Sequence, residues 1–378
     1  MGAVGSSLAA ISFFFDRPYE TPVAALKPVD HSWVLSEAIY ALRGQGRLQE
    51  ALPGMRAVVR SDEEAQRLER AANAASNQSQ TELLFGDVAA AVGMAEKSVA
   101  LADRAGDAFW MVACRAIQAD ALHAAGEWEK AADLFADAER RQQEWQPEYP
   151  LLYSMQGYRY CDLLLSRGRA GEARDQAART AQWARQHLGL LDVALDTLTI
   201  GRACLVLALQ SPASEALAAS ASADARTAAA KLDEAVEGLS AAGANEFIAR
   251  GLLARAAFRR IVGDTDGARR DLDEAQEIAE PGPMRLHLCE CALERARVAL
   301  ALREAFAPLN GLVEPSPPPP ALPDAAEAAR LLAEARKELD VARKLIADCG
   351  YHRRDEELAE LDAVAAGKSR FADLPPRV

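Results

Sequence analysis

Residues 126–138 read GEWEKAADLFADA, and this stretch decides the fold. Its apolar residues recur at spacings of three and four, at Ala131, Leu134, Phe135 and Ala138, which places them along one side of a helix. Gly126 supplies the left-handed backbone conformation that ends a preceding helix. Ala131, five residues later, lets the next helix approach its partner closely. The stretch therefore predicts a helix, a tight turn and a second helix.

The same pattern recurs along the chain. A glycine is followed five residues later by an alanine at Gly46 and Ala51, Gly86 and Ala91, Gly126 and Ala131, Gly168 and Ala173, and Gly263 and Ala268. Two further copies keep the small and apolar spacing without the glycine, at Ala228, Leu232 and Ala235 and at Ala335, Leu339 and Ala342. Second helices often end in glycine as well, at Gly106, Gly189, Gly243 and Gly350. Such a period changes the fold prediction from separate domains to a repeat array.

The anchor alanines of the seven copies lie 40, 40, 42, 55, 40 and 67 residues apart. We interpret the two long intervals as low-complexity insertions before the second helix of their repeats, near residues 211–226 and 303–325. The first is rich in serine and alanine, and the second contains the proline run of residues 315–320. Without them the period stays near 40 residues.

The composition agrees with an all-α array. The chain has 378 residues, of which 82 are alanine and only 6% are aromatic. Because alanine is the best helix former and is depleted in strands, a sandwich, a barrel or a large parallel sheet is excluded. One hairpin cannot bury its apolar stripe alone, whereas stacked hairpins can. The sequence therefore predicts an α-solenoid of about seven helical hairpins over residues 29–366. Residues 1–28 form an N-terminal extension that can pack on the first repeat, and residues 367–378 form a tail. Phe13, Phe14 and Phe15 either cap the open apolar end of the stack or mark the place where a domain is missing upstream.

These residues resemble the tetratricopeptide repeat (TPR), in a version longer than the 34-residue standard. More specifically, residues 105–109, 126–131, 146–154, 158–165 and 350–355 are similar to the C-terminal repeat arms of bacterial STAND-type (NACHT-like) signalling NTPases. The resemblance covers roughly residues 14 to 362. It implies a right-handed superhelix of TPR-like hairpins whose first helices line a concave groove. In that family the repeats bind or sense a partner, while a separate NTPase module switches.

The chain departs from that family because it contains no NTPase motif. A phosphate-binding loop needs a glycine-rich turn between a strand and a helix that ends in Gly-Lys-Ser or Gly-Lys-Thr. Only Gly367-Lys368-Ser369 comes near, and Asp362 stands where the first glycine is required. We expect any ATP-driven switching to come from another polypeptide or from a part not included in this chain.

Charge and cysteine usage narrow the function further. The formal net charge of −13 argues against nucleic acid as the main partner. The six cysteines are spread too thinly for a disulfide-stapled secreted domain, and the apolar N-terminus lacks the cations of a secretory signal. No apolar run is long enough to span a membrane. We therefore expect a cytoplasmic protein that needs no cofactor and does not bind a membrane.

Candidate catalytic and metal sites are weak. His287, Glu290 and Cys291 stand at i, i+3 and i+4 on an expected helix, but structural zinc needs four ligands, so a packed histidine beside buried thiols is favoured. Gly238 to Gly243 has one residue too many for a nucleophile elbow and lies at a helix end. We expect no enzymatic activity.

Candidate partner-binding residues come from two segments. Trp145, Tyr149, Tyr153, Tyr158 and Tyr160 gather aromatic rings in an aromatic-poor chain, with Arg159 among them. Tyrosine and arginine are favoured at interface hot spots, although the rings can equally fill the packing between repeats. Residues 351–354 are the densest basic patch, and they either dock an acidic partner or complement the carbonyls of a helix end. The predicted partner-binding residues are Trp145, Tyr149, Tyr153, Arg159, Gln118, Arg353 and Arg354.

The predicted function is that of a non-catalytic scaffold or sensor arm that binds a protein or peptide in its groove. The alternative is a ligand-responsive regulatory subunit of a signalling NTPase or a transcriptional regulator, in which a small effector changes assembly.

Overall fold

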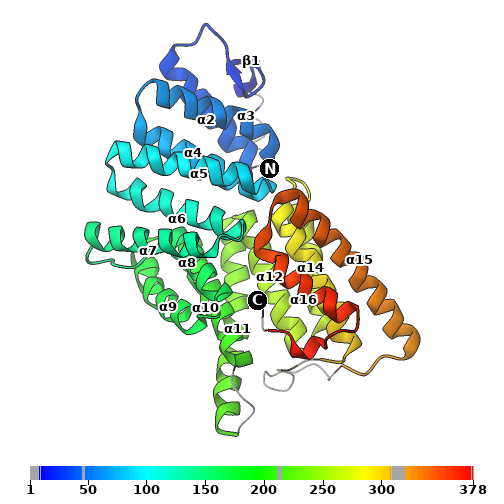
Figure 1. Cartoon of the computed structure of the whole chain (residues 1–378). Helices are drawn as coiled ribbons and strands as arrows, with labels where there is room; N and C mark the ends of the chain where they lie inside the picture. Colours follow the sequence, from blue (N-terminus) through cyan, green and yellow to red (C-terminus); the bar gives the residue numbers. More distant parts are fainter. Residues whose placement is uncertain are drawn as a thin grey trace. The chain divides into compact units, whose positions relative to one another are not determined.

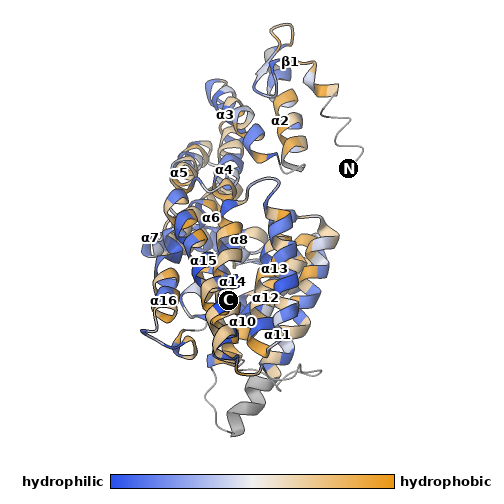
Figure 2. Cartoon of the chain, turned by 90° about the vertical axis from the view of Figure 1, so that its right-hand side faces the viewer, coloured by the Kyte–Doolittle hydropathy of each residue, from blue (hydrophilic) through white to orange (hydrophobic). Residues whose placement is uncertain are grey.

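The computed structural model describes residues 8, 10–44, 47–210, 215–306, 308, 320–375 and 377, and within them the protein is almost entirely helical (Figure 1). One two-stranded antiparallel ribbon, β1 (Phe15–Arg17) and β2 (Thr21–Pro22), precedes the helices. The all-α prediction is confirmed. Polar and apolar residues interleave along the helices, as amphipathic helices require (Figure 2).

The chain divides into two compact units. The first comprises Met1–Pro150, Glu280–Leu286 and Cys349–Tyr351, and its helices are α2 (Pro28–Gly44), α3 (Leu48–Glu64), α4 (Leu68–Phe85), α5 (Val88–Ala105), α6 (Ala108–Ala124) and α7 (Trp128–Trp145). Each of these helices packs on the next one in the chain, and α4 also packs on α6. Small side chains dominate the core between α3 and α6, including Ala71, Ala72, Ala75 and Ala102.

The second unit comprises Leu151–Ala279, His287–Asp348 and His352–Val378. Its helices are α8 (Ser154–Ser166), α9 (Ala170–His187), α10 (Leu190–Gln210), α11 (Glu215–Ala242), α12 (Asn245–Val262), α13 (Thr265–Ala279), most of α14 (Arg285–Arg303) and of α15 (Ala325–Cys349), α16 (Asp355–Ala365), and the short 3₁₀ turns η1 (His352–Arg354) and η2 (Phe371–Asp373). Consecutive helices from α8 to α13 pack on one another, and α10 also packs on α8 and α12. Larger side chains fill this core, among them Leu195, Leu198, Leu232, Leu252 and Leu272.

The anchor alanines lie at helix–helix contacts. Ala51, Ala91, Ala131, Ala173, Ala228, Ala268 and Ala335 are all 0% exposed. In the five copies with the turn glycine, the alanine is the fourth residue of its helix. At a close contact a larger side chain would force the two helices apart, so the repeated alanine is explained by packing.

The turn glycines adopt the predicted conformation at Gly86, Gly106, Gly126, Gly168, Gly243, Gly263 and Gly350, all with positive φ. Gly86 has a second constraint, because a Cβ there would lie 2.7 Å from Cys349 Sγ. The prediction is wrong at Gly189. Helix α9 ends instead through Leu188 in extended backbone, and Gly189 donates its N–H to the Asp192 carboxylate at the start of α10. Gly46 lies outside the described residues.

The two expected insertions differ in secondary structure: the first is largely helical, and the second lies between the end of α14 and the start of α15. Helix α11 begins at Glu215, so most of the segment near 211–226 belongs to this helix. Its alanines explain this, because they favour helix as well as lowering the complexity of the sequence. In the segment near 303–325, α14 ends at Arg303, and Asp324 accepts a hydrogen bond from Glu327 N that starts α15. Residues 211–214, 307 and 309–319 lie outside the described part.

The N-terminal extension packs on the first hairpin. Leu8 contacts a cluster of α2 and α3 that includes Leu42 and Met55, and Phe15 joins Val34 and Leu35. Of the three phenylalanines expected to cap the stack, only Phe15 is buried, whereas Phe13 and Phe14 are exposed. The capping is therefore achieved by one ring out of three.

Candidate functional site

Three predicted site residues belong to the first unit. Trp145 ends α7, is 39% exposed, and lies edge-on to Phe109 with ring centroids 6.2 Å apart. Tyr149 lies in the loop that follows, where its carbonyl accepts a hydrogen bond from the Gln142 side chain. Gln118 is half-buried on α6. Sequence reasoning missed Phe109, which is 42% exposed and whose position after the Asp107 cap of α6 turns it toward solvent.

The remaining aromatic candidates lie in the second unit and are mostly packing residues. Tyr153 precedes α8 and packs edge-on against Trp183. Tyr158 is buried against Phe247. Arg159 is also buried, so it offers little surface to a partner. The predicted cluster of residues 145–160 is thus split between the two units, and its second half favours the packing interpretation.

Arg353 and Arg354 lie on η1 and take part in ion pairs inside the second unit. Arg353 donates to Asp162 Oδ2 at 2.6 Å and to Ser166 Oγ at 3.2 Å. Arg354 donates to Glu290 Oε1 and to Glu357 Oε2, both at 2.8 Å. Carboxylates of α8, α14 and α16 are therefore partners of the basic patch.

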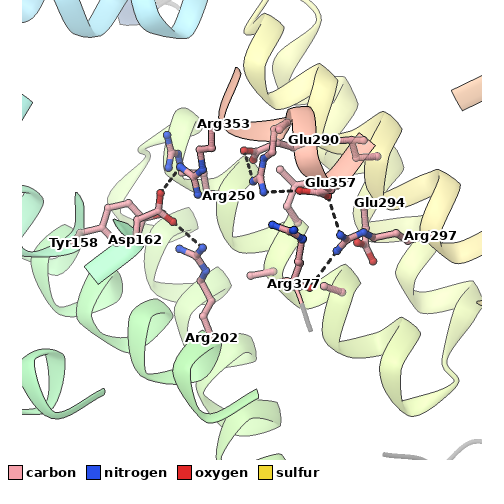
Figure 3. Close-up of a pocket in the computed structure, with 15 residues that line it drawn as sticks. Tyr158, Asp162, Arg202, Arg250, Glu290, Glu294, Arg297, Arg353, Glu357 and Arg377 are labelled. Carbon is pink, nitrogen blue, oxygen red and sulfur yellow. Dashed lines mark hydrogen bonds and ion pairs between the residues drawn. The ribbon is translucent and has the colours of Figure 1, made fainter. Parts of the chain in front are cut away.

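These two arginines line a cavity of about 60 Å³ in the second unit (Figure 3). Its walls come from five helices, the η1 turn and the tail. Helix α8 provides Tyr158 and Asp162, α10 provides Arg202, α16 provides Glu357, and the tail provides Arg377. We call this cavity the arginine pocket.

Two helical stripes form most of its surface. On α12 the lining residues are Arg250, Leu253, Ala254 and Ala257, and on α14 they are Glu290, Leu293, Glu294 and Arg297. Both sets follow the spacing i, i+3, i+4, i+7, which places each along one helix face. The alanines of α12 leave space where longer side chains would fill the interior, so the ionic side chains surround a void.

Arginine–carboxylate pairs organise the walls. Figure 3 shows Asp162 between Arg202 and Arg353, and its oxygens accept from them at 2.7 and 2.6 Å. Glu357 binds Arg297 at 3.0 Å as well as Arg354. Glu294 binds Arg260, which lies behind the wall, at 2.6 Å. The fork of each guanidinium is thereby held in a fixed orientation.

Positive charge exceeds negative charge on the described lining. Six arginines face four carboxylates, in a chain whose net charge is −13. Burial, followed by the charges of Arg260 and Arg354, lowers the pKa of Arg297 in spite of Glu357 and Glu294. Although burial opposes ionisation of Glu290, Arg354 and Arg250 hold the pKa of that carboxyl below its usual range. The site therefore favours anions and disfavours further cations.

The Arg297 side chain is 93% buried, because its exposed fraction is 7%. Its terminal nitrogens donate to the Arg377 carbonyl at 3.2 Å and bind Glu357. Its Nε is buried without a hydrogen-bond partner. A charged donor left in this state costs free energy, so Arg297 marks the place where an additional acceptor would be most favourable.

The tail closes one side of the pocket. Phe371 is buried, packs on the Phe306 ring, and donates its N–H to Glu304. Arg377 binds Glu360 through two hydrogen bonds of 2.8 and 3.0 Å. Phe371 and Arg377 thus anchor the tail to the rest of the second unit.

The His287 region is a packing site. His287 is buried and its Nε2 lies 2.9 Å from the Glu246 carbonyl, while burial and then the charge of Arg250 lower its pKa to about 4. Glu290 is directed to Arg354. No group of three metal-ligating side chains occurs among the described residues. The six cysteines are buried thiols, and burial raises the pKa of Cys114 to about 11 and that of Cys291 to about 12.

Within the described part of the chain, no helix is both long and apolar enough to cross a membrane. Compared with known proteins, the chain matches no family model and no curated relative. The pocket and the repeat are therefore interpreted from their own chemistry.

Most lining residues were missed by sequence reasoning. A signal existed on α14, where Glu290, Glu294 and Arg297 place charges along a stripe that would be apolar if it only packed. The contact between Asp162 and Arg353 had no such signal, because 191 residues separate them.

Proposed function

We propose that this chain is a non-catalytic interaction protein, in which about seven TPR-like hairpins form a right-handed superhelix that binds a protein or peptide partner. The proposal is supported by the seven fully buried anchor alanines and by the packing of each helix on the next from α2 to α7 and from α8 to α13. The sequence resemblance to the repeat arms of STAND-type NTPases suggests a sensor arm whose NTPase acts from another polypeptide. We place it in the cytoplasm.

The observation that carries partner binding is the exposed aromatic pair of Phe109 and Trp145. Phe109 and Trp145 are both partly exposed and lie edge-on to one another, so they form one continuous aromatic surface. Tryptophan is enriched at interface hot spots because it contributes a large apolar area and still keeps one polar atom. Tyr149 and Gln118 belong to the same unit, and we assign them to the same interaction surface.

The test is affinity capture from the native host with the full chain, compared with the double variant Phe109→Ala and Trp145→Ala. We expect a stable partner whose captured amount falls at least tenfold with the double variant. Both rings are partly covered, so the variant should melt at a slightly lower temperature but still unfold cooperatively. Leu190→Ala is the control, because Leu190 is an apolar residue of the second unit that is 65% exposed, more than Phe109 or Trp145. An identical partner set for the double variant would refute this surface.

The arginine pocket favours a second candidate function, ligand-responsive regulation. A surface scaffold has no need of a pocket lined by largely buried charged groups. A small effector that fills the cavity can shift an assembly equilibrium if it binds one state better than the other. The partner measurement repeated with and without effector distinguishes the two candidates.

A further inference from the structure

The arginine pocket has the features of a site for a small anion. Its charged groups lie inside the second unit, its Arg297 donor Nε is buried without an acceptor, and its volume is about 60 Å³. We propose that the pocket binds a phosphate group, held by Arg297, Arg250 and Arg202. This inference deepens the ligand-responsive candidate and rests on it for its regulatory consequence.

The charge balance supports an anion of this kind. The lining carries two more arginines than carboxylates. Three charged residues outside the lining form ion pairs with lining residues. Arg260 pairs with Glu294 and contributes one positive charge, and Glu356 and Glu360 pair with Arg377 and contribute two negative charges. The excess is therefore one to two positive charges, depending on how strongly solvent screens the exposed Glu356. A phosphate monoester carries about 1.5 to 2 negative charges at pH 7, so one group neutralises the site.

The geometry of the donors supports an oxyanion. The planar guanidinium matches the oxygen pairs of phosphate and can donate two parallel hydrogen bonds. Asp162 fixes Arg202 from one side, and the Tyr158 ring lies 5.9 Å from the guanidinium carbon of Arg250. Because these forks are already oriented, binding costs little side-chain entropy.

The size of the cavity limits the ligand. A water molecule needs about 10–15 Å³ of such volume, so the pocket has room for a few waters or for one phosphate group. It is too small for a nucleobase or a peptide segment. The ligand is either free phosphate or the terminal phosphate of a small metabolite whose remainder lies outside the cavity.

The experiment measures binding by calorimetry and thermal unfolding of the full chain, at constant pH and with ionic strength matched by sodium chloride. We expect a saturable rise in the melting temperature with inorganic phosphate or with glycerol phosphate. Tighter binding of inorganic phosphate identifies the free anion, and tighter binding of glycerol phosphate identifies an esterified one. No saturable response beyond that of chloride, or tighter binding of malonate than of either phosphate, would overturn the proposal.

Variants locate the site. Arg297→Gln and Arg250→Gln should each weaken phosphate binding at least tenfold. Arg255→Gln is the matched control, because Arg255 lies on the same helix as Arg250 but binds Asp271 outside the pocket. Its phosphate affinity should stay within twofold of the unchanged chain.

Ala257→Asp keeps every arginine and tests the site without removing a cation. The new carboxylate takes the position of the anion, so this variant should melt at a higher temperature without phosphate and no longer respond to it. A retained phosphate response in Ala257→Asp and in Arg297→Gln would place binding elsewhere and overturn the assignment. If the unchanged chain does not bind phosphate but still captures its partner, the phosphate proposal fails and the scaffold function stands.

Discussion

Arg115 in the first unit and Arg297 in the second are equally buried, each with 6% exposure, yet their environments are opposite. Burial alone would lower the pKa of Arg115, but its hydrogen bonds to Asp103 and Asp137 raise it. Burial and neighbouring arginines lower the pKa of Arg297. The first unit balances its buried cation with two carboxylates that reach the solvent. In the second unit the lining of the arginine pocket carries six arginines and only four carboxylates.

The two units therefore differ in what their buried side chains do: those of the first unit pack helices together, and those of the second unit also line a pocket. In the first unit buried alanines pack between the helices, and the buried cation Arg115 is paired with Asp103 and Asp137, which both reach the solvent. In the second unit a cavity replaces part of the packing, and ion pairs hold its walls. Buried ionic networks are weak evidence for stability, so a binding role is the better explanation of the pocket.

The largest effect is expected from the carboxylate that joins two pocket arginines. Asp162→Ala removes the acceptor shared by Arg202 and Arg353, and should lower the free energy of unfolding by about 3–5 kcal/mol. Asp103→Ala should cost less than about 1 kcal/mol, because Asp103 is exposed and Arg115 keeps Asp137. Urea unfolding of both variants measures the difference. Equal losses would show that the two units do not differ in charge balance.

The next largest change in the free energy of unfolding is expected from Asp196, a buried carboxylate of the second unit. Burial raises the pKa of Asp196 to about 7, its Oδ1 accepts a hydrogen bond from Thr180 Oγ1, and its Oδ2 is buried without a hydrogen-bond partner. The folded state therefore holds a proton that the unfolded state releases between about pH 4 and 7. The contribution of Asp196 to stability is present below pH 4 and is lost as the pH rises through 7.

Asp196→Asn should remove this loss and stabilise the chain at pH 8 by up to about 4 kcal/mol, at 1.4 kcal/mol per pKa unit. At pH 4 the variant and the unchanged chain should unfold at the same urea concentration. His287 has the opposite sign, because its lowered pKa makes folding less favourable as the pH falls from 6.5 to 4. Both the Asp196→Asn variant and the unchanged chain contain His287, so its contribution is the same in both and drops out when their free energies of unfolding are subtracted at each pH. A pH-independent difference would contradict the assignment.

The smallest effect comes from one substitution made in both units. Ala131→Val adds two methyl groups at a closed helix contact and should cost about 1–3 kcal/mol. Ala257→Val directs the same groups into the cavity and should cost less than about 1 kcal/mol. Both residues are helical, so the lower helix propensity of valine is common to the pair. Thermal unfolding under one condition compares them, and an equal cost would mean that the pocket is as closely packed as the repeat contact.

The local parts of the fold could be predicted from the sequence. Gly86 and Gly263 end helices in the predicted conformation because the information lies in one residue and its immediate neighbours. Leu188 shows the limit, since an extended residue ends α9 just before the glycine that was expected to do so. In α11 the helix-forming alanines outweigh the low-complexity pattern.

The candidate site could be predicted only in part. Arg353 and Arg354 were selected for their density of charge, and they do line the pocket. Their carboxylate partners and the cavity could not be derived, because they depend on α8, α14 and α16 meeting in space. Arg159 shows the converse: its sequence neighbours made it a candidate, while its position on α8 buries it.

The link between Asp162 and Arg353 also has a consequence for biosynthesis. A ribosome that adds about 5–20 residues per second makes Arg353 roughly 10–40 s after Asp162. The hairpins can fold during this interval, because their contacts are local. The pocket is completed only when the last helices have emerged. A prematurely terminated chain could therefore retain many of its repeats and still be unable to bind the anion, so that ligand binding would report the completeness of the newly made protein.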